Sequence, residues 1–262
     1  MNIYTYVNSY ILELFRMAIL DLDLDFFLDV ISDSKPDGGR LDGRDYHPWT
    51  EEEVVDFLEK RCGLSRTKPI KGIIVEKHHE AFFYWRNLVL EGQLKVPFEV
   101  VHIDAHSDLG KCDWGFIYLM GELLHNPPEE RTHPKVDEVF GLGEGNYLAF
   151  AVACRWIRKI TFVLHPQWKS DADLLDLHFK DFDINSGYLQ LKKYLESDVY
   201  RLGATGTFEP LDFEPQIPFE MIPSLEYKNN RRFSFMILSH SPDYTPKTSD
   251  NLIPIIKTYM NY

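Results

Sequence analysis

The chain has 262 residues, of which 44% are hydrophobic and 14% aromatic, so it can bury a sizeable core, which argues against a disordered protein. Its formal net charge of -13 disfavours a nucleic-acid partner, because phosphate binding requires a basic surface. A cationic substrate or a divalent metal suits an acidic protein better. Cys62, Cys112 and Cys154 are odd in number and form no CxxC pair, which indicates reduced thiols in a cytoplasm.

The N-terminal stretch YILELFRMAIL (10–20) is apolar, but it is too short to span a bilayer and contains Glu13 and Arg16. The residues that follow are heavily acidic and include no small-residue cleavage site. We therefore expect neither a signal peptide nor a membrane anchor.

Five short apolar runs, rich in β-branched or aromatic residues, predict strands at 17–27, 70–76, 98–104, 159–165 and 233–240. Amphipathic patterns between them predict helices at 50–63, 80–92, 146–158 and 186–197. In the first helix, Thr50 is the expected cap, with Glu53 three residues later. This alternation predicts a three-layer α/β/α fold with a mainly parallel sheet, as a single domain over residues 1–262. Residues 205–230 contain four prolines and no clear periodicity, and we expect an ordered excursion over the surface there.

Polar side chains gather where the predicted strands end. They are Asp21, Asp23 and Asp25; Glu76, His78 and His79; Asp104, His106 and Asp108; His165; and His240 with Asp243. In a parallel α/β sheet, ligands bind beyond the carboxyl ends of the strands. Three carboxylates on one side of a buried strand repel one another and lose hydration, and a cation offsets that cost. Carboxylates with neutral imidazoles suit Mn²⁺, Zn²⁺ or Fe²⁺, and five such ligands from two segments favour two bridged metals.

Each cluster also has an interpretation without a metal. Residues 104–108 could form Asx turns and a helix cap, and residues 21–25 could form an exposed edge strand. One histidine of the adjacent pair at 78–79 could lie on the surface, and His165 and His240 could be hydrogen-bonded loop residues. Because five clusters fall at the same edge of one predicted sheet, the metal site is the favoured interpretation.

The segment DAHSD (104–108) matches the Asp-Ala-His-x-Asp signature of the arginase and deacetylase-like superfamily, in which the first Asp bridges two Mn²⁺ ions. DLDLDFF (21–27) resembles the Asp-x-Asp pair of that superfamily, although it precedes DAHSD here. With this order, and with VEKHHEAFFYW, GEGNYLAFAV, VLHPQW and SHSPDYTP, the chain resembles a divergent family that includes bacterial peptide arginases. Those enzymes convert arginine residues of ribosomal peptides to ornithine. The resemblance runs from about residue 18 to 246.

The resemblance implies an arginase-like fold and a site for two Mn²⁺ ions, with Fe²⁺ or Co²⁺ as alternatives. The implied ligands are Asp104 and Asp23 as bridges, Asp108 and His78 for one ion, and His106 and Asp25 for the other. His78 is preferred to His79 because it falls two residues after Glu76 at the end of a strand. The implied reaction is attack of activated water on the guanidinium of a precursor peptide, which releases urea.

Two features of small-molecule arginases are missing. Their Gly-Asn-x-His proton-shuttle motif reads GNYL here, which keeps Asn146 as a substrate-binding candidate but has Leu148 at the histidine position. His165 and His240 are therefore the candidate catalytic proton donors, with water as the alternative. The usual glutamate for the guanidinium is not matched either, and the candidate substitutes are Asp243, Glu76 and Glu80.

Three other functions compete with this one. The first is another hydrolysis on the same scaffold, such as deacetylation or hydrolysis of a small guanidino compound. The second is a phosphatase that uses Asp21 and Asp23 as nucleophile and acid, although Asp25 stands where such enzymes generally carry Thr or Val. The third is a non-catalytic metal-binding module in a peptide-modifying complex.

The stretches LGKCDW after Asp108 and HPQW after Leu164 lack the groups with which small-molecule enzymes recognise the ends of free arginine. We expect Trp114, Trp168 and the 205–230 segment to line a broader mouth that suits neutral peptide backbone. The alternative is that these aromatic side chains belong to the core.

Overall fold

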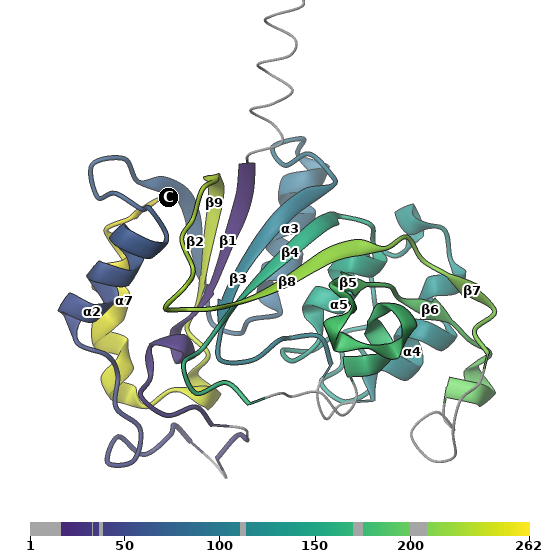
Figure 1. The fold of residues 1–262 in the computed structure, drawn as a ribbon, viewed down its shortest axis with the longest axis horizontal. Helices are drawn as coiled ribbons and strands as arrows, with labels where there is room; N and C mark the ends of the chain where they lie inside the picture. The colour runs from purple at the N-terminus through teal and green to yellow at the C-terminus, as the bar shows by residue number, and fades with distance from the viewer. Residues whose placement is uncertain (1–16, 33, 37–38, 111–113, 170–174, 200–208) are drawn as a thin grey trace, which may run out of the picture.

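The structure is a computed structural model that describes residues 17–32, 34–36, 39–110, 114–169, 175–199 and 209–262. Its centre is an eight-stranded sheet in the order β10-β2-β9-β1-β3-β4-β8-β5 (Figure 1). The strands are β1 (Met17–Asp23), β2 (Ile70–Val75), β3 (Phe98–Asp104), β4 (Ile157–Leu164), β5 (Tyr188–Leu189), β8 (Ile217–Pro223), β9 (Arg232–Ser239) and β10 (Met260–Asn261). Neighbouring strands are parallel except for β5 and β8. A separate antiparallel pair joins β6 (Lys192–Lys193) to β7 (Asp212–Phe213).

Helices cover both faces of the sheet, because successive strand residues point to opposite sides. On one side α3 (Glu80–Leu90) and α5 (Tyr147–Ala153) pack over Ile19 and its neighbours. On the other side α2 (Glu51–Asp56) and α7 (Ile253–Lys257) pack over Leu20. The predicted three-layer α/β/α fold with a mainly parallel sheet is therefore confirmed.

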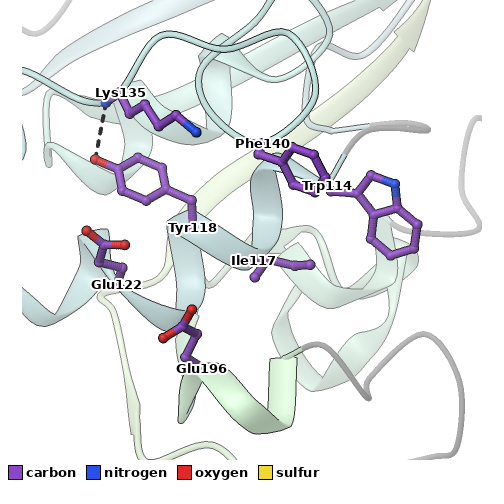
Figure 2. Close-up of a pocket in the computed structure, with 7 residues that line it drawn as sticks. All are labelled: Trp114, Ile117, Tyr118, Glu122, Lys135, Phe140 and Glu196. Atoms are coloured by element: carbon purple, nitrogen blue, oxygen red, sulfur yellow. Dashed lines mark hydrogen bonds between the residues drawn. The ribbon is translucent and has the colours of Figure 1, made fainter.

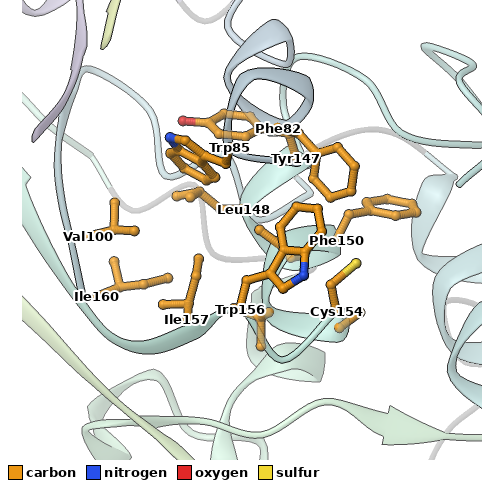
Figure 3. Packing of buried hydrophobic residues seen from close by; sticks show 14 of the residues in the cluster. Phe82, Trp85, Val100, Tyr147, Leu148, Phe150, Cys154, Trp156, Ile157 and Ile160 are labelled. Carbon is orange, nitrogen blue, oxygen red and sulfur yellow. The ribbon is translucent and has the colours of Figure 1, made fainter. Parts of the chain in front are cut away.

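The layer formed by α3 and α5 is rich in aromatic side chains. Phe82 and Trp156 lie with their ring centroids 4.8 Å apart, and Trp85 packs against Tyr147 at 5.8 Å (Figure 3). These side chains are almost fully buried, and rings of this size contribute large apolar areas to a core. In this layer α5 packs against α3 and β4, and Tyr147 is the first residue of that helix.

Most predicted elements are present. All five predicted strands form, and the helix predicted at 50–63 begins with a capping box. Thr50 Oγ1 accepts from the Glu53 N–H at 3.3 Å, while the Glu53 carboxylate accepts from the Thr50 N–H at 2.8 Å. The helix predicted at 146–158 ends earlier, at Ala153, because Arg155 has a left-handed backbone (φ 56°) and β4 starts two residues later.

Two predictions were wrong. Residues 186–197 do not form one helix: Gly187 (φ 75°) closes a 3₁₀ turn, and β5 and β6 follow. Leu189 and Leu191 are both buried, so their spacing of two residues belongs to extended chain. The 205–230 segment, described from residue 209, is not a surface excursion, because it contains β8. Prolines hid that strand from sequence analysis, since proline is found mainly near sheet edges, and β8 lies beside the edge strand β5.

No helix in the described part of the chain is long and apolar enough to cross a bilayer. Residues 1–16, which hold much of the N-terminal apolar stretch, lie outside that part, as does Cys112. Cys62 and Cys154 are buried free thiols.

Candidate metal centre

The polar clusters meet where β1 and β3 end side by side. From β1 the chain continues to β2, which lies toward one edge of the sheet. From β3 it continues to β4, which lies toward the opposite edge. The connections diverge at the carboxyl ends of these strands, which is the switch point at which α/β sheets bind ligands. Asp23 and Asp104 are the last residues of the two strands.

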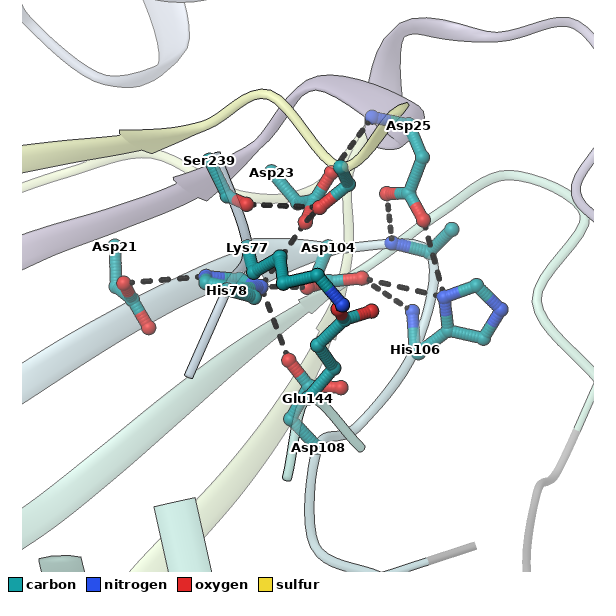
Figure 4. A network of polar contacts seen from close by, with 12 residues as sticks. Asp21, Asp23, Asp25, Lys77, His78, Asp104, His106, Asp108, Glu144 and Ser239 are labelled. Atoms are coloured by element: carbon teal, nitrogen blue, oxygen red, sulfur yellow. Dashed lines mark hydrogen bonds and ion pairs between the residues drawn. The ribbon is translucent and has the colours of Figure 1, made fainter. Parts of the chain in front are cut away.

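All six predicted metal ligands converge at this point (Figure 4). They are Asp23, Asp25, His78, Asp104, His106 and Asp108. Five are buried, and the side chain of His106 keeps 20% of its surface exposed. His79 lies outside the group, with its Nδ1 3.8 Å from Glu138 Oε1. Of the two adjacent histidines, only His78 lies among the aspartates of the centre, whereas His79 lies near Glu138 and Glu144.

The group has two halves that share Asp104. In the first half, His78 Nδ1 lies 3.0 Å from Asp23 Oδ2 and 2.9 Å from Asp104 Oδ2. The same nitrogen lies 3.0 Å from Asp108 Oδ2. In the second half, His106 Nδ1 lies 3.1 Å from Asp25 Oδ2 and 3.6 Å from Asp104 Oδ1. The two oxygens of Asp104 thus face different histidines.

Local backbone geometry directs the carboxylates inward. A 3₁₀ turn, η1 (Leu24–Phe27), follows β1 at once, and Asp23 caps it by accepting from the Asp25 N–H at 2.9 Å. Asp108 has a left-handed backbone (φ 49°), a conformation that Asp tolerates better than most residues. Gly110 follows at φ 113°, where a side chain would be strained, and its N–H donates to the Gly145 carbonyl at 2.7 Å.

The residues fit a divalent metal. His78 Nδ1 and Asp108 Oδ2 are buried without a hydrogen-bond partner among the described residues, although they lie 3.0 Å apart. Unpaired buried polar atoms are costly and call for an explanation such as an ion. Adjacent ligands of an octahedral ion with bonds of about 2.1 Å lie about 3 Å apart, which is the spacing found around this nitrogen. Carboxylate oxygens and imidazole nitrogens are also the donors that Mn²⁺, Fe²⁺ and Zn²⁺ accept.

Burial and mutual repulsion disturb the pKa values of these groups. Burial and the charges of Asp23 and Asp104 raise the pKa of Asp25 well above its usual range. Burial and the Asp104 charge raise the pKa of Asp108 to about 7. Burial also disfavours the charged form of Asp104, but the close rings of His106 and His78 hold its pKa well below the usual range. Without a metal, the centre therefore retains protons to balance its carboxylates.

The pKa values of His78 and His106 are raised, although burial alone lowers the pKa of a histidine. Burial favours the neutral ring of His78, yet the charge of Asp21 and the close carboxylates of Asp104 and Asp108 raise its pKa well above the ordinary value. Burial likewise opposes protonation of His106, and Asp104 and Asp25 raise its pKa. A metal ion would replace these protons, because ligands must be deprotonated to bind it.

Three side chains near the centre were not identified from the sequence: His102, Tyr147 and Ser241. His102 is the register partner of Asp21, and its Nδ1 lies 3.1 Å from Asp21 Oδ2. Tyr147 donates its hydroxyl to the same oxygen. Ser241 donates its hydroxyl to Asp23 Oδ2. Only strand register and helix packing bring these residues to the site, and a single sequence does not display either.

The two predicted proton donors are engaged elsewhere. His165 is buried, with Nε2 2.8 Å from the Leu28 carbonyl and Nδ1 accepting from the Gln167 N–H at 3.1 Å. His240 Nε2 lies 2.8 Å from Asp250 Oδ1, which also binds Arg40 at 2.7 Å. Both rings therefore have structural partners, as the alternative interpretation of these histidines expected.

The predicted substrate-binding residues are mostly held by backbone groups or lysine. Asn146 is buried; its amide oxygen accepts from the Gly143 N–H at 2.9 Å and its amide nitrogen donates to the Gly141 carbonyl at 2.8 Å. Glu80 accepts from the N–H of Glu76 at 2.9 Å, and the Glu76 side chain is exposed. Asp243 is partly exposed and pairs with Lys35 at 3.3 Å.

Glu144 is a further buried acid in this part of the structure. It binds Lys77, the residue before His78, at 2.7 Å and Lys35 at 3.1 Å (Figure 4). Burial disfavours its charged form, but the two lysines lower its pKa and keep it ionised. It is therefore a carboxylate that already accepts cations next to the predicted ligands.

The predicted mouth aromatics differ from each other. Trp168 packs against the core, with its ring 5.9 Å from that of Phe162. Trp114 is 50% exposed and lines a cavity of about 460 Å³ next to α4 (Gly115–Gly121) (Figure 2). The other lining residues are Ile117, Tyr118, Glu122, Lys135, Phe140 and Glu196. We call this cavity the Trp114 groove.

The arrangement can hold one or two divalent cations, and such cations would polarise a water molecule bound to them. No protein-family model, curated protein or solved structure matches the chain.

Proposed function

We propose that the protein is a dinuclear metal-dependent hydrolase that converts arginine residues of a peptide to ornithine and releases urea. The observation that carries this proposal is the convergence of six predicted ligands around Asp104, with His78 Nδ1 buried among three carboxylates and without a hydrogen bond to any described residue. The resemblance of DAHSD and DLDLDFF to arginase-like motifs supports the choice of a guanidinium substrate.

The chain would hold the ions through the two halves of the centre. Asp23, His78 and Asp108 would bind one ion and Asp25 and His106 the other, with Asp104 shared. Two such ions, Mn²⁺ in the proposal and Fe²⁺ or Co²⁺ as alternatives, lower the pKa of water so that hydroxide forms near neutral pH. Ser241 would keep Asp23 oriented through its hydroxyl, because it donates to Oδ2 of that residue.

Glu144 would bind and orient the guanidinium of the substrate. Glu144 is ionised, buried and already paired with two ammonium groups, so it suits a cationic side chain that takes the place of Lys77. This assignment moves the guanidinium acid from the predicted Glu76, Glu80 or Asp243 to Glu144. Because both His165 and His240 have structural partners, we assign delivery of the proton to the leaving amine to water.

A peptide substrate is favoured over free arginine by the Trp114 groove. Trp114 follows Asp108 by six residues, so the groove lies within about 20 Å of the centre along an extended chain. The 137–144 loop also links the two, because Phe140 lines the groove while Glu144 binds Lys77, the residue before His78. Exposed aromatic side chains suit the residues that flank an arginine in an extended peptide.

The buried, free thiols of Cys62 and Cys154 support a reducing compartment, and we propose the cytoplasm.

The test is a mass spectrum of arginine-containing peptides incubated with Mn²⁺-loaded protein. We expect loss of CH₂N₂ from an arginine with equimolar urea. Asp104→Asn should abolish the loss, whereas Asp212→Asn, which removes an exposed carboxylate on β7, should retain it. Loss of acetyl or phosphate instead would establish one of the competing hydrolases. Metal binding without any mass change would indicate a non-catalytic module.

A further inference from the structure

Asp21 is a fully buried carboxylate that belongs to neither half of the centre. It lies on β1 two residues before Asp23 and faces the layer that contains α3 and α5. Its Oδ1 lies 3.3 Å from His78 Nε2. Its Oδ2 lies 3.1 Å from His102 Nδ1 and accepts the Tyr147 hydroxyl at 2.5 Å. Three side chains therefore converge on this one carboxylate from β3, α5 and the turn after β2.

The hydrogen bonds determine which nitrogen of His78 carries a proton. Tyr147 has a single hydroxyl hydrogen, which it donates to Asp21, so its oxygen can only accept from His78 Nε2 at 2.9 Å. Asp21 Oδ1, the other polar atom near that nitrogen, is also an acceptor. His78 Nε2 must therefore carry hydrogen, and in the neutral ring this leaves the lone pair of Nδ1 facing the three carboxylates.

His106 has the same arrangement with a different partner. Its Nε2 lies 3.0 Å from the Ser32 carbonyl oxygen, which is an acceptor, and its Nδ1 faces Asp25 and Asp104. The two histidines thus present the same nitrogen to the centre. Nε2 of His106 faces a neutral carbonyl, whereas Nε2 of His78 faces a carboxylate and a phenol.

We propose that Asp21 and Tyr147 are positioning residues that hold His78 with hydrogen on Nε2 and Nδ1 directed at the metal site. This inference rests on the proposed metal centre. A carboxylate behind a ligating histidine fixes the tautomer and the ring orientation and makes the imidazole a stronger donor. The rotation of His78 is restricted further by the Tyr147 ring, whose centroid lies 4.8 Å from that of His78.

The same geometry separates this role from a competing one. A phosphatase that used Asp21 as nucleophile would need that carboxylate open to substrate. Asp21 has no exposed surface, and both of its oxygens already face donors. Its position behind His78 therefore suits support of a ligand and leaves no access for phosphate.

The experiment compares Tyr147→Phe and Asp21→Asn with the wild type by calorimetric titration with Mn²⁺. We expect affinity at one of two sites to fall roughly 10–100-fold in each variant while the other site is unchanged. Tyr227→Phe is the matched control, because Tyr227 is also buried but its hydroxyl has no hydrogen-bond partner among the described residues. Its two affinities should equal those of the wild type.

A second measurement reports on the ring itself. In Zn²⁺-loaded, ¹⁵N-histidine-labelled protein, His78 should give the spectrum of a ring protonated at Nε2, and Tyr147→Phe should shift that signal but not the signal of His106. Unchanged affinities and unchanged His78 signals in both variants would overturn the positioning role. Wild-type protein that binds no metal would instead remove the proposed function, so the two failures are distinguishable.

Discussion

The two oxygens of Asp104 face different histidines, one toward His78 and one toward His106. Substitution of this residue should therefore remove both metal ions, because each half of the centre loses a charged ligand. We expect Asp104→Ala to bind almost no Mn²⁺ in metal analysis of purified protein, while His106→Ala should retain about one ion per chain. Full metal content in Asp104→Ala would show that the constellation does not bind metal as proposed.

The sequence alone predicted the candidate metal ligands, but it did not predict the residues that form hydrogen bonds with them. Asp104 and Asp108 stand directly after a predicted strand, so their place at the sheet edge follows from the hydrophobic pattern alone. His102 lies inside that strand, and its function depends on being level with Asp21 of β1. Register between strands is set by long-range packing, which a single sequence does not display.

Among the elements, α4 and the 137–144 loop form the Trp114 groove, where Trp114 and Phe140 are about half exposed. We expect Trp114→Ala and Phe140→Ala to raise KM for an arginine peptide with apolar flanking residues by about 10-fold, with kcat little changed. Neither variant should alter KM for free arginine. Leu90→Ala, which removes an exposed leucine at the end of α3, is the control.

Steady-state assays of urea release from the arginine peptide and from free arginine measure these KM values. An equal rise in KM for peptide and free arginine would place the groove at the guanidinium and not at the flanking residues. Faster turnover of free arginine than of the peptide by the wild type would contradict the peptide assignment and leave the metal centre intact.

The elements that sequence analysis missed share a physical cause. In the 186–197 segment Leu191 and Leu195 have the four-residue spacing of a helical face, whereas buried Leu189 and Leu191 have the two-residue spacing of a strand, and Gly187 and the neighbouring β8 decide between the two. In β8, buried Ile217 and Phe219 alternate with exposed Pro218 and Glu220, a strand pattern that prolines disguised. Strands with continuous apolar runs were predicted correctly because burial on both faces leaves a simple signal.

For the whole molecule, the metal-free protein should become less stable as pH rises from about 6.5 to about 8. The pKa values of Asp25, Asp108, His78 and His106 are raised, so over this range the folded state holds protons that the unfolded chain no longer holds: unfolded aspartates lose theirs at about pH 4, and unfolded histidines lose theirs at about pH 6.5. Histidines with lowered pKa, such as His178 at about 3, oppose the trend only at about pH 6.5, where their unfolded rings are still about half protonated, and are neutral in both states above about 7.5.

Thermal unfolding followed with chelator and with Mn²⁺ measures this effect. The Tm of the chelated protein should fall across the range, and the increase in Tm given by Mn²⁺ should grow with pH, because metal and protons compete for the same atoms. A chelated protein whose Tm rises with pH in this window, or a metal effect that shrinks, would contradict the arrangement of charges at the centre.

The position of β9 bears on how the protein is made. All six predicted ligands lie between residues 23 and 108, yet β9 (Arg232–Ser239) sits between β1 and β2, and Ser241 after it contacts Asp23. With one strand missing, the turn that carries His78 has no fixed place beside β1, since neighbouring strands are about 4.8 Å apart. We therefore expect a growing chain to expose all six predicted ligands before β9 can hold them together, and the proposed metal centre to form only after β9 has been translated.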